Sequence, residues 1–274
     1  MLKALNKLFP LPQHPFNMQA EGEKTYAEWQ YEKGDQTIKF YLEYTDIDTM
    51  FRGRTVLDIG CGAGGKSLYY LSQGAEKVVG IDIVPHYKEE AEALAAKLGL
   101  EGFTFMVQDA AATDFADDTF DTIIANDAME HVARPEAVLK EIHRILKPGG
   151  RFYVNFPPYN HPFGAHLSDV IGMPWVQVFF SDKTLIAAYK ELVADKPDGA
   201  DRISFRFSTD ENGEEYYSYI NRMTIKRFRR ILADTDLPHI YYREVPLRPY
   251  LAWLNKIGLR EYFTRMVVCV FEKK

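Results

Sequence analysis

The sequence is poor in cysteine, has no excess of basic charge and contains no long apolar run. Its two cysteines, Cys61 and Cys269, are too few for a disulfide framework. A formal net charge of -6 argues against a broad basic surface that would bind a phosphate backbone. These absences exclude a disulfide-stapled secreted domain and predict a protein with reduced thiols that does not bind nucleic acid.

The N-terminal residues (MLKALNKLFPLPQHPF) have no apolar run long enough for a signal-peptide core or a membrane span. Leu2, Leu5 and Leu8 have helical spacing, which predicts a helix that packs on its own domain; a weak amphipathic anchor is the alternative. We expect a soluble, cytoplasmic protein without membrane contact, and the sequence leaves its oligomeric state open.

The composition that is present is globular, with 46% hydrophobic, 26% charged and 14% aromatic residues. From residue 55 onward, apolar segments of strand length alternate with helical patterns, which predicts an α/β fold with a parallel sheet and crossover helices. The expected strands are 55–59, 78–83, 103–108, 120–125, 151–156, 239–245 and 266–271. The expected helices are 66–73, 85–98, 135–146 and 224–233.

This alternation stops at residue 158 and resumes at residue 224. The stretch between them is rich in aromatic residues, and its length is typical of a functional insertion or a small subdomain. We expect three parts: an N-terminal helical cap segment over 1–50, a core over 51–157 and 224–274, and an inserted capping segment over 158–223.

A glycine-rich segment, VLDIGCGAGG at 56–65, follows the first strand and opens a helix, so backbone N–H groups there can face a ligand. Gly60, Gly62 and Gly65 satisfy the pattern G-x-G-x-x-G. Asp82 stands 20 residues after Gly62 at the end of the second strand, where a carboxylate suits ribose hydroxyls. This pattern by itself equally favours a dinucleotide, so a nicotinamide-dependent oxidoreductase is one alternative.

Asp58 separates these interpretations, because it lies two residues before Gly60. A carboxylate at the turn would repel a pyrophosphate but would attract a ligand that carries an ammonium group and a sulfonium. The pattern therefore favours S-adenosylmethionine. Asp109, at the end of the third strand, is placed to accept a hydrogen bond from an adenine amino group; a helix cap is its alternative role.

Residues 52–156 resemble the class I S-adenosylmethionine-dependent methyltransferases. The resemblance is carried by VLDIGCGAGG, VVGIDI, QDA, FDTIIANDAMEHV and LKPGG, in the order usual for that family. It implies a Rossmann-like, doubly wound, mostly parallel sheet with an antiparallel last strand, and S-adenosylmethionine as cofactor. It also implies contact with the methionine part at Asp58 and Gly60, with ribose at Asp82 and with adenine near Asp109. The full expected cofactor set is Asp58, Gly60, Cys61, Gly62, Asp82, Ile83, Asp109, Ala110 and Asn126.

The segment NDAMEHV (126–132) spaces Asp127, Glu130 and His131 at i, i+3 and i+4, which would place them on one face of a helix start. It resembles the acid-x-x-Glu-His stretch of ubiquinone-pathway O-methyltransferases, and that resemblance implies a divalent metal. The departure is Asp127, which is shorter than the glutamate of that family. We therefore do not favour a metal and interpret His131 as orienting a loop. A divalent metal is the alternative, and His161 and His166 could complete such a site with His131.

Methyl transfer from a sulfonium is an in-line displacement, so it needs a positioned acceptor and a base only when the acceptor loses a proton. His161 and His166, in NHPFGAH at the start of the insertion, are candidates for that base, together with His131. The alternative is that they are solvated loop histidines.

Two further patterns do not change this interpretation. NFPPY at 155–159 resembles the box of amino-group methyltransferases that act on nucleobases, but it has an extra phenylalanine and follows the fifth strand instead of the fourth. The basic run at 226–230 has apolar residues at helical spacing and predicts a solvated helix face. We expect methyl transfer to a small molecule, at oxygen, with nitrogen, carbon and a non-catalytic cofactor-binding module as alternatives.

Overall fold

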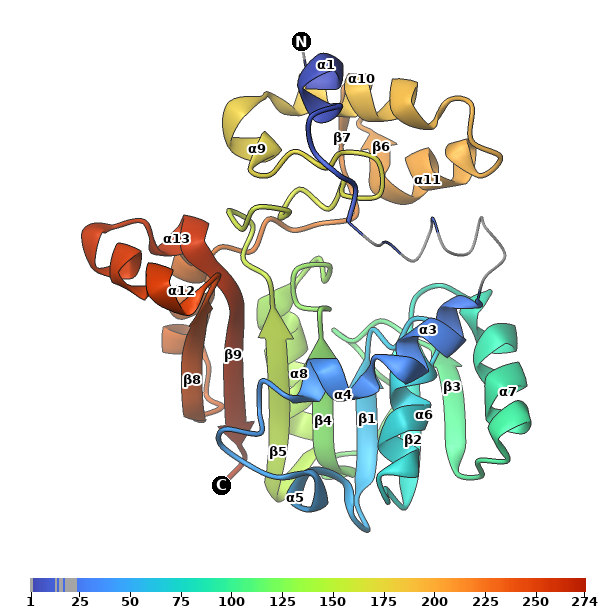
Figure 1. Ribbon diagram of the computed structural model, residues 1–274. Coiled ribbons are helices and arrows are strands. Elements are labelled where there is room, and N and C mark those ends of the chain that lie inside the picture. Colours follow the sequence, from blue (N-terminus) through green and yellow to red (C-terminus); the bar gives the residue numbers. More distant parts are fainter. Residues whose placement is uncertain (1, 13, 15–16, 18–23) are drawn as a thin grey trace. The chain divides into compact units, whose positions relative to one another are not determined.

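The computed structural model describes residues 2–12, 14, 17 and 24–274, and the chain forms two compact units (Figure 1). The sheet unit consists of residues 24–156, 226–245 and 266–274. The insertion unit consists of residues 1–23, 157–225 and 246–265. Each unit is described by itself.

The sheet unit is built on seven strands in the order β3-β2-β1-β4-β5-β9-β8 (Figure 1). Their bounds are β1 Thr55–Ile59, β2 Lys77–Asp82, β3 Phe103–Val107, β4 Phe120–Asn126, β5 Leu146–Phe156, β8 His239–Pro246 and β9 Thr264–Glu272. The first five strands pair in parallel, and β9 runs antiparallel to β5 with Val154 opposite Cys269. The expected Rossmann-like fold with an antiparallel last strand is therefore confirmed.

Helices of the sheet unit follow from local signals in the sequence. Their bounds are α3 Tyr26–Glu32, α4 Gly34–Ile38, α5 Ile47–Phe51, α6 Gly65–Ser72, α7 Tyr87–Leu98, α8 Pro135–Ile145 and α12 Ile225–Asp234. Proline opens α8, while Gly99 ends α7 in a left-handed conformation that only glycine adopts readily. In α12 the apolar Ile225, Phe228 and Ile231 are buried, as the spacing of the basic run predicts.

The main apolar core of this unit joins residues that are distant in the sequence. Tyr41 and Phe51 pack with Tyr70 of α6, Tyr153 of β5 and Val268 of β9. The ring of Phe51 stacks on Tyr70 at 4.9 Å between centroids. These contacts make residues 24–51 part of the core that supports the sheet.

The boundary between α8 and β5 differs slightly from the expectation. Leu146 pairs with Phe120 of β4, so the helix ends one residue earlier and the strand begins five residues earlier than predicted. An irregularity follows between Phe120 and Thr122. Pairing with a neighbouring strand thus overrides the helical periodicity at this residue.

The insertion unit has regular structure of its own, where the sequence shows no clear alternation. Its elements are α1 Leu2–Asn6, α9 Val176–Phe179, α10 Asp182–Val193, α11 Gly199–Arg206, the antiparallel pair β6 Phe207–Thr209 and β7 Glu215–Tyr217, the 3-10 helix η1 Pro249–Ile257, and α13 Arg260–Phe263. Leu185, Tyr189, Phe207 and Tyr217 lie in a separate apolar core. The segment is a folded subdomain.

The N-terminal helix α1 belongs to the insertion unit. Asn6 donates to the carbonyl of Val170 at 2.7 Å and accepts from the backbone N–H of Gly172 at 2.8 Å. Leu2 is buried in the same core. Leu2–Asn6 therefore forms a helix that packs within the insertion unit, while Leu8 lies beyond its end and is 75% exposed.

A buried ion cluster lies within the insertion unit. The Asp169 carboxylate contacts the guanidinium groups of Arg202 and Arg206, each at 3.1 Å, and accepts a hydrogen bond from Tyr189 at 2.8 Å.

In the part of the chain that the structure describes, no helix is both long and apolar enough to cross a membrane.

Candidate functional site

The glycine turn after β1 requires glycine for two separate reasons. Gly60 and Gly62 have φ values of 68° and 54°, in the left-handed region that disfavours other residues. A Cβ on Gly60 would also lie 2.9 Å from the Cβ of Ala128. The turn is held because the N–H groups of Gly60 and Cys61 both donate to the carbonyl of Ile81, at 2.9 and 3.1 Å.

Helix α3 packs directly on this turn. A Cβ on Gly65 would lie 2.0 Å from the carbonyl oxygen of Ala27. The Gln30 side chain bridges the turn, because its amide donates to the carbonyl of Cys61 and its oxygen accepts from the N–H of Gly65, both at 3.2 Å. Sequence reasoning missed Gln30, since nothing in its local pattern marks it.

Asp58 lies beneath the turn at the end of β1 and is 2% exposed. Its carboxylate accepts a hydrogen bond of 2.6 Å from the hydroxyl of Ser67 in α6. Burial raises the pKa of Asp58 to about 6, so the group is ionised at neutral pH. A buried carboxylate of this kind is suited to a cationic partner.

Asp82 connects the second strand to the glycine turn. One carboxylate oxygen accepts from the N–H of Gly62 at 2.9 Å, and the other accepts from the N–H of Val84 at 3.0 Å. Burial raises the pKa of Asp82, while these backbone hydrogen bonds lower it. The structure thus brings together Asp82 and Gly62, which the motif predicts to bind one ligand. The adjacent Ile83 is 72% exposed.

Cys61 and Ala110 are both buried. Burial raises the pKa of the Cys61 thiol well above its ordinary value, so this cysteine is protonated and serves as a small apolar residue. Asp109, next to Ala110, accepts from the N–H of Ala111 at 2.8 Å and lies 3.4 Å from Arg134. Its side chain is 61% exposed, so it combines the turn-capping role with an accessible carboxylate.

Asn126, at the end of β4, uses its side chain in the interior. Its oxygen accepts from the hydroxyl of Tyr41 and the amide of Asn155, each at 2.7 Å, and its amide donates to Tyr70 at 2.8 Å. Burial raises the pKa values of both tyrosines, so they remain phenols. If Asn126 contacts a cofactor, it would therefore do so through its backbone atoms.

The turn after β4 corrects one expectation. Residues 126–132 do not begin a helix, because Asp127 is left-handed with φ 53° and α8 begins only at Pro135. The carboxylate of Asp127 forms an ion pair of 3.3 Å with Lys66 in α6. Asp127, Glu130 and His131 therefore do not lie on one face of a helix.

Glu130 occupies the same turn and is 3% exposed. Neither carboxyl oxygen has a hydrogen-bond partner, and Nε2 of His131 lies 3.8 Å from Oε1. Burial raises the pKa of Glu130 well above its ordinary value, and the negative charge of Asp127 raises it further.

The other two candidate histidines lie in the insertion unit. Nδ1 of His161 accepts the backbone N–H of Phe163 at 3.2 Å. Burial lowers the pKa of His161 to about 4, and the charge of Arg265 acts in the same direction. His161 is therefore neutral with its proton on Nε2, which makes it a hydrogen-bond donor. His166 has a left-handed backbone, and its ring lies edge-on to Tyr219 at 6.2 Å.

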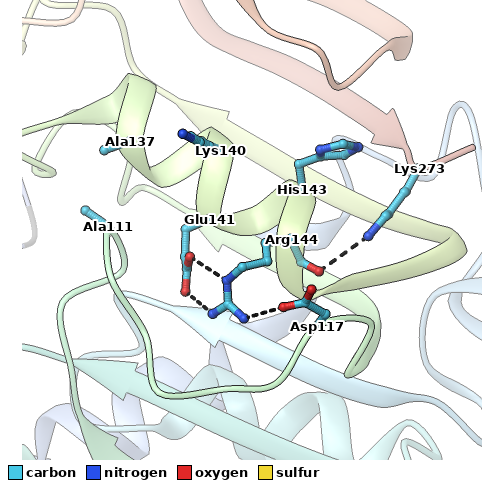
Figure 2. Close-up of a pocket in the computed structure, with 8 residues that line it drawn as sticks. All are labelled: Ala111, Asp117, Ala137, Lys140, Glu141, His143, Arg144 and Lys273. Atoms are coloured by element: carbon cyan, nitrogen blue, oxygen red, sulfur yellow. Dashed lines mark hydrogen bonds and ion pairs between the residues drawn. The ribbon is translucent and has the colours of Figure 1, made fainter.

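A surface pocket lies along the outer side of α8 (Figure 2). Arg144 forms ion pairs with Glu141 at 2.6 Å and Asp117 at 2.8 Å, and Lys273 contacts the carbonyl of Arg144 at 3.4 Å. Arg144 holds the pKa of Glu141 at about 2. Because these charges compensate one another and no expected cofactor residue lines the pocket, we interpret it as a stabilising ion network.

Comparison with known proteins gives the same picture for the core. A family model described as a methyltransferase domain matches residues 51–189. Phosphoethanolamine N-methyltransferase 3 of Arabidopsis thaliana is 32% identical over 44% of this chain and 24% of its own length. Tocopherol O-methyltransferase of the same plant is 31% identical over 44% of this chain and 34% of its own length. The matched part thus spans about a quarter to a third of these curated relatives.

Solved structures share the fold at low sequence identity. The PH0226 protein of Pyrococcus horikoshii has a TM-score of 0.57 and 21% identity, and the alignment covers 96% of this chain and 100% of that one. A chain from the complex of the Haloferax volcanii Trm112 methyltransferase activator with a methyltransferase has a TM-score of 0.54 and 19% identity, covering 94% and 95%. The cyclase SpnF has a TM-score of 0.56 and 17% identity, covering 90% and 84%.

Proposed function

This chain belongs to the methyltransferase domain family, the class I S-adenosylmethionine-dependent methyltransferases, and we propose that it transfers a methyl group to an oxygen atom of a small molecule. One observation carries the proposal. The backbone N–H of Gly62 in the glycine turn donates a hydrogen bond of 2.9 Å to the carboxylate of Asp82, and Asp58 is buried next to the same turn. These three elements come from two neighbouring strands and their connecting turn, at the carboxyl edge where open α/β sheets bind ligands.

The donor set fits S-adenosylmethionine better than a dinucleotide. Asp58 is ionised at neutral pH and its hydrogen-bond partner, Ser67, is neutral, so the carboxylate favours a cationic group of a ligand, although the charge of Lys66 also acts on it. A pyrophosphate at the same place would be repelled by the negative charge of Asp58. When bound, S-adenosylmethionine supplies an electrophilic methyl group on a sulfonium.

The chain's own residues bind the cofactor and hold the acceptor in position. In the proposal, Asp58 binds the ammonium group, Asp82 accepts from the ribose hydroxyls, and Asp109 accepts from the adenine amino group. Helix α3 keeps the turn rigid through Gln30. Much of the rate enhancement comes from holding the acceptor in line, because the reaction needs no nucleophile from the protein.

The choice of a small-molecule acceptor is supported by the net charge of -6 and by the names of the relatives. Those names include O-, N- and C-methyltransferases, so methylation at nitrogen or carbon is the second candidate.

Calorimetry tests the cofactor part of this proposal. We expect the purified chain to bind S-adenosylmethionine and S-adenosylhomocysteine at micromolar concentrations. We also expect S-adenosylmethionine, but not NADH, to raise the unfolding temperature, because a ligand that binds only the folded state stabilises it. Protection by NADH alone would support the oxidoreductase alternative. If neither S-adenosylmethionine nor S-adenosylhomocysteine binds, the proposal is refuted.

A further inference from the structure

The carboxyl group of Glu130 is an exception among the buried acids. Asp58 and Asp169, the other carboxylates that the described chain buries almost completely, accept hydrogen bonds from Ser67 and from Tyr189 and two arginines. Both oxygens of Glu130 lack such a partner. A buried polar group without a partner destabilises the folded state, and native proteins retain few of them.

Glu130 lies beside the proposed cofactor cradle, by which we mean Asp58, the glycine turn at 60–65 and Asp82. It lies in the turn that directly follows β4 at the carboxyl edge of the sheet. In the same turn, Ala128 faces the backbone of Gly60, and Asp127 pairs with Lys66 in the first turn of α6. The glycine turn of the cradle and the helix that follows it therefore contact the turn that carries Glu130.

The missing partner must satisfy a carboxyl group in an enclosed place. A hydroxyl both donates and accepts hydrogen bonds, so it satisfies the carboxyl group in either protonation state. An ammonium group satisfies only the ionised form, and a second carboxylate satisfies only the protonated form. A hydroxyl is thus a neutral partner that satisfies Glu130 whether or not the carboxyl group is ionised.

We propose that Glu130 is an acceptor-binding residue, whose carboxyl group forms a hydrogen bond with a hydroxyl of the methyl acceptor. This inference rests on the proposed methyltransferase function and narrows the acceptor to a hydroxylated molecule. In the ligand-free protein the carboxyl group is left without a partner, so binding affinity for the acceptor is gained at the expense of stability.

The first test measures stability without any acceptor. Glu130→Met replaces the carboxyl group with an apolar side chain of similar length and is expected to raise the unfolding temperature by roughly 2–8 °C. Glu141→Met is the matched control, because Glu141 pairs with Arg144 and Thr113, and its loss is expected to lower the unfolding temperature. A Glu130→Met variant that is destabilised as much as the control would overturn the inference.

The second test measures acceptor use. Wild type, Glu130→Met and Glu130→Gln are incubated with methyl-labelled S-adenosylmethionine and catechol, phenol, benzylamine or benzoate as probes. We expect an unchanged affinity for S-adenosylmethionine in all variants, and a KM for a hydroxylated probe that rises at least tenfold in Glu130→Met. Glu130→Gln, which keeps hydrogen-bonding atoms, is expected to lose less.

The two tests separate this inference from the proposed function. Failure of the wild type to bind S-adenosylmethionine refutes the proposed function, whatever Glu130 does. Binding of S-adenosylmethionine with an unchanged probe KM in Glu130→Met refutes the role of Glu130 alone. If the wild type methylates none of the four probes, the direction of the temperature shift decides.

Discussion

At the scale of single residues, Asp58 has the clearest electrostatic role. Its pKa rises from 3.8 to about 6 because the side chain is buried. The folded state therefore binds more protons than the unfolded chain between these two values, and the stability of the fold falls as pH rises from about 4 to 7. Burial of this carboxylate therefore costs stability at neutral pH, where Asp58 is ionised.

Substitution of Asp58 by asparagine tests this role. In the wild type we expect the affinity for S-adenosylmethionine to rise between pH 5 and pH 7, because ionised Asp58 attracts its ammonium group. Asp58→Asn should bind about tenfold or more weakly at pH 7.5 and show a flat pH dependence over that range. Calorimetry at three pH values measures both effects, and an identical slope in the two proteins would contradict the assignment.

The histidines show how far residue types alone can be interpreted. Histidine suits a general base because its ordinary pKa is near neutrality. In His161, however, the backbone N–H of Phe163 occupies Nδ1, and burial lowers the pKa to about 4. The side chain is thus suited to donate a hydrogen bond from Nε2, and the general base stays a prediction for His131, His161 and His166.

At the scale of secondary-structure elements, the contact between α3 and the glycine turn is the main determinant of the cradle. Gly65 has an ordinary helical backbone, so its requirement for glycine comes from the carbonyl of Ala27 and not from strain. The same contact positions Gln30 over Cys61 and Gly65. The motif glycines therefore accommodate a helix of the protein as well as a ligand.

Gly65→Ala tests this contact. The added methyl group should displace α3, lower the free energy of unfolding by about 1–3 kcal/mol, and weaken S-adenosylmethionine binding several-fold. Gly99→Ala is the matched control, because no atom lies within 4 Å of its added Cβ and only its backbone φ of +63° is unfavourable. The control should lose about 1 kcal/mol by urea unfolding and bind the cofactor normally. Equal binding losses in both variants would argue against the role of α3.

At the scale of the whole molecule, the chain contains two units with separate cores. The sheet unit contains all of the expected cofactor residues, while His161 and His166 belong to the insertion unit. The insertion unit is stabilised by Asp169 between two buried arginines. Because breaking a buried ion pair leaves an uncompensated charge, this unit depends strongly on one residue.

Asp169→Asn should therefore destabilise the insertion unit by about 3–5 kcal/mol. Asp198→Asn removes a partly exposed partner of Arg202 and should cost less than a third as much. Hydrogen exchange resolved by segment provides the measurement, with protection lost in 176–217 and retained in β1, β2 and β4. Loss of protection throughout the chain in Asp169→Asn would show that the two units unfold together.

The local sequence by itself determined the sheet, the glycine turn and the pairing of that turn with Asp82. These features depend on contiguous patterns: buried strands, caps such as Gly99, and a motif whose parts lie within one βαβ unit. The mostly parallel sheet with an antiparallel last strand and the cofactor class follow from these patterns and from the resemblance that they carry, and both are confirmed.

Only the tertiary structure decided which side chains meet across long stretches of chain. Gln30 contacts the turn from 31 and 35 residues away, and Asn126 is held by Tyr41 from 85 residues away. The helix expected at Asp127 fails because that residue is left-handed and pairs with Lys66. Neither periodicity nor residue type records such contacts, since they depend on which surfaces are adjacent after folding. For the same reason Glu130 stands out only in the structure, where its lack of a partner becomes visible.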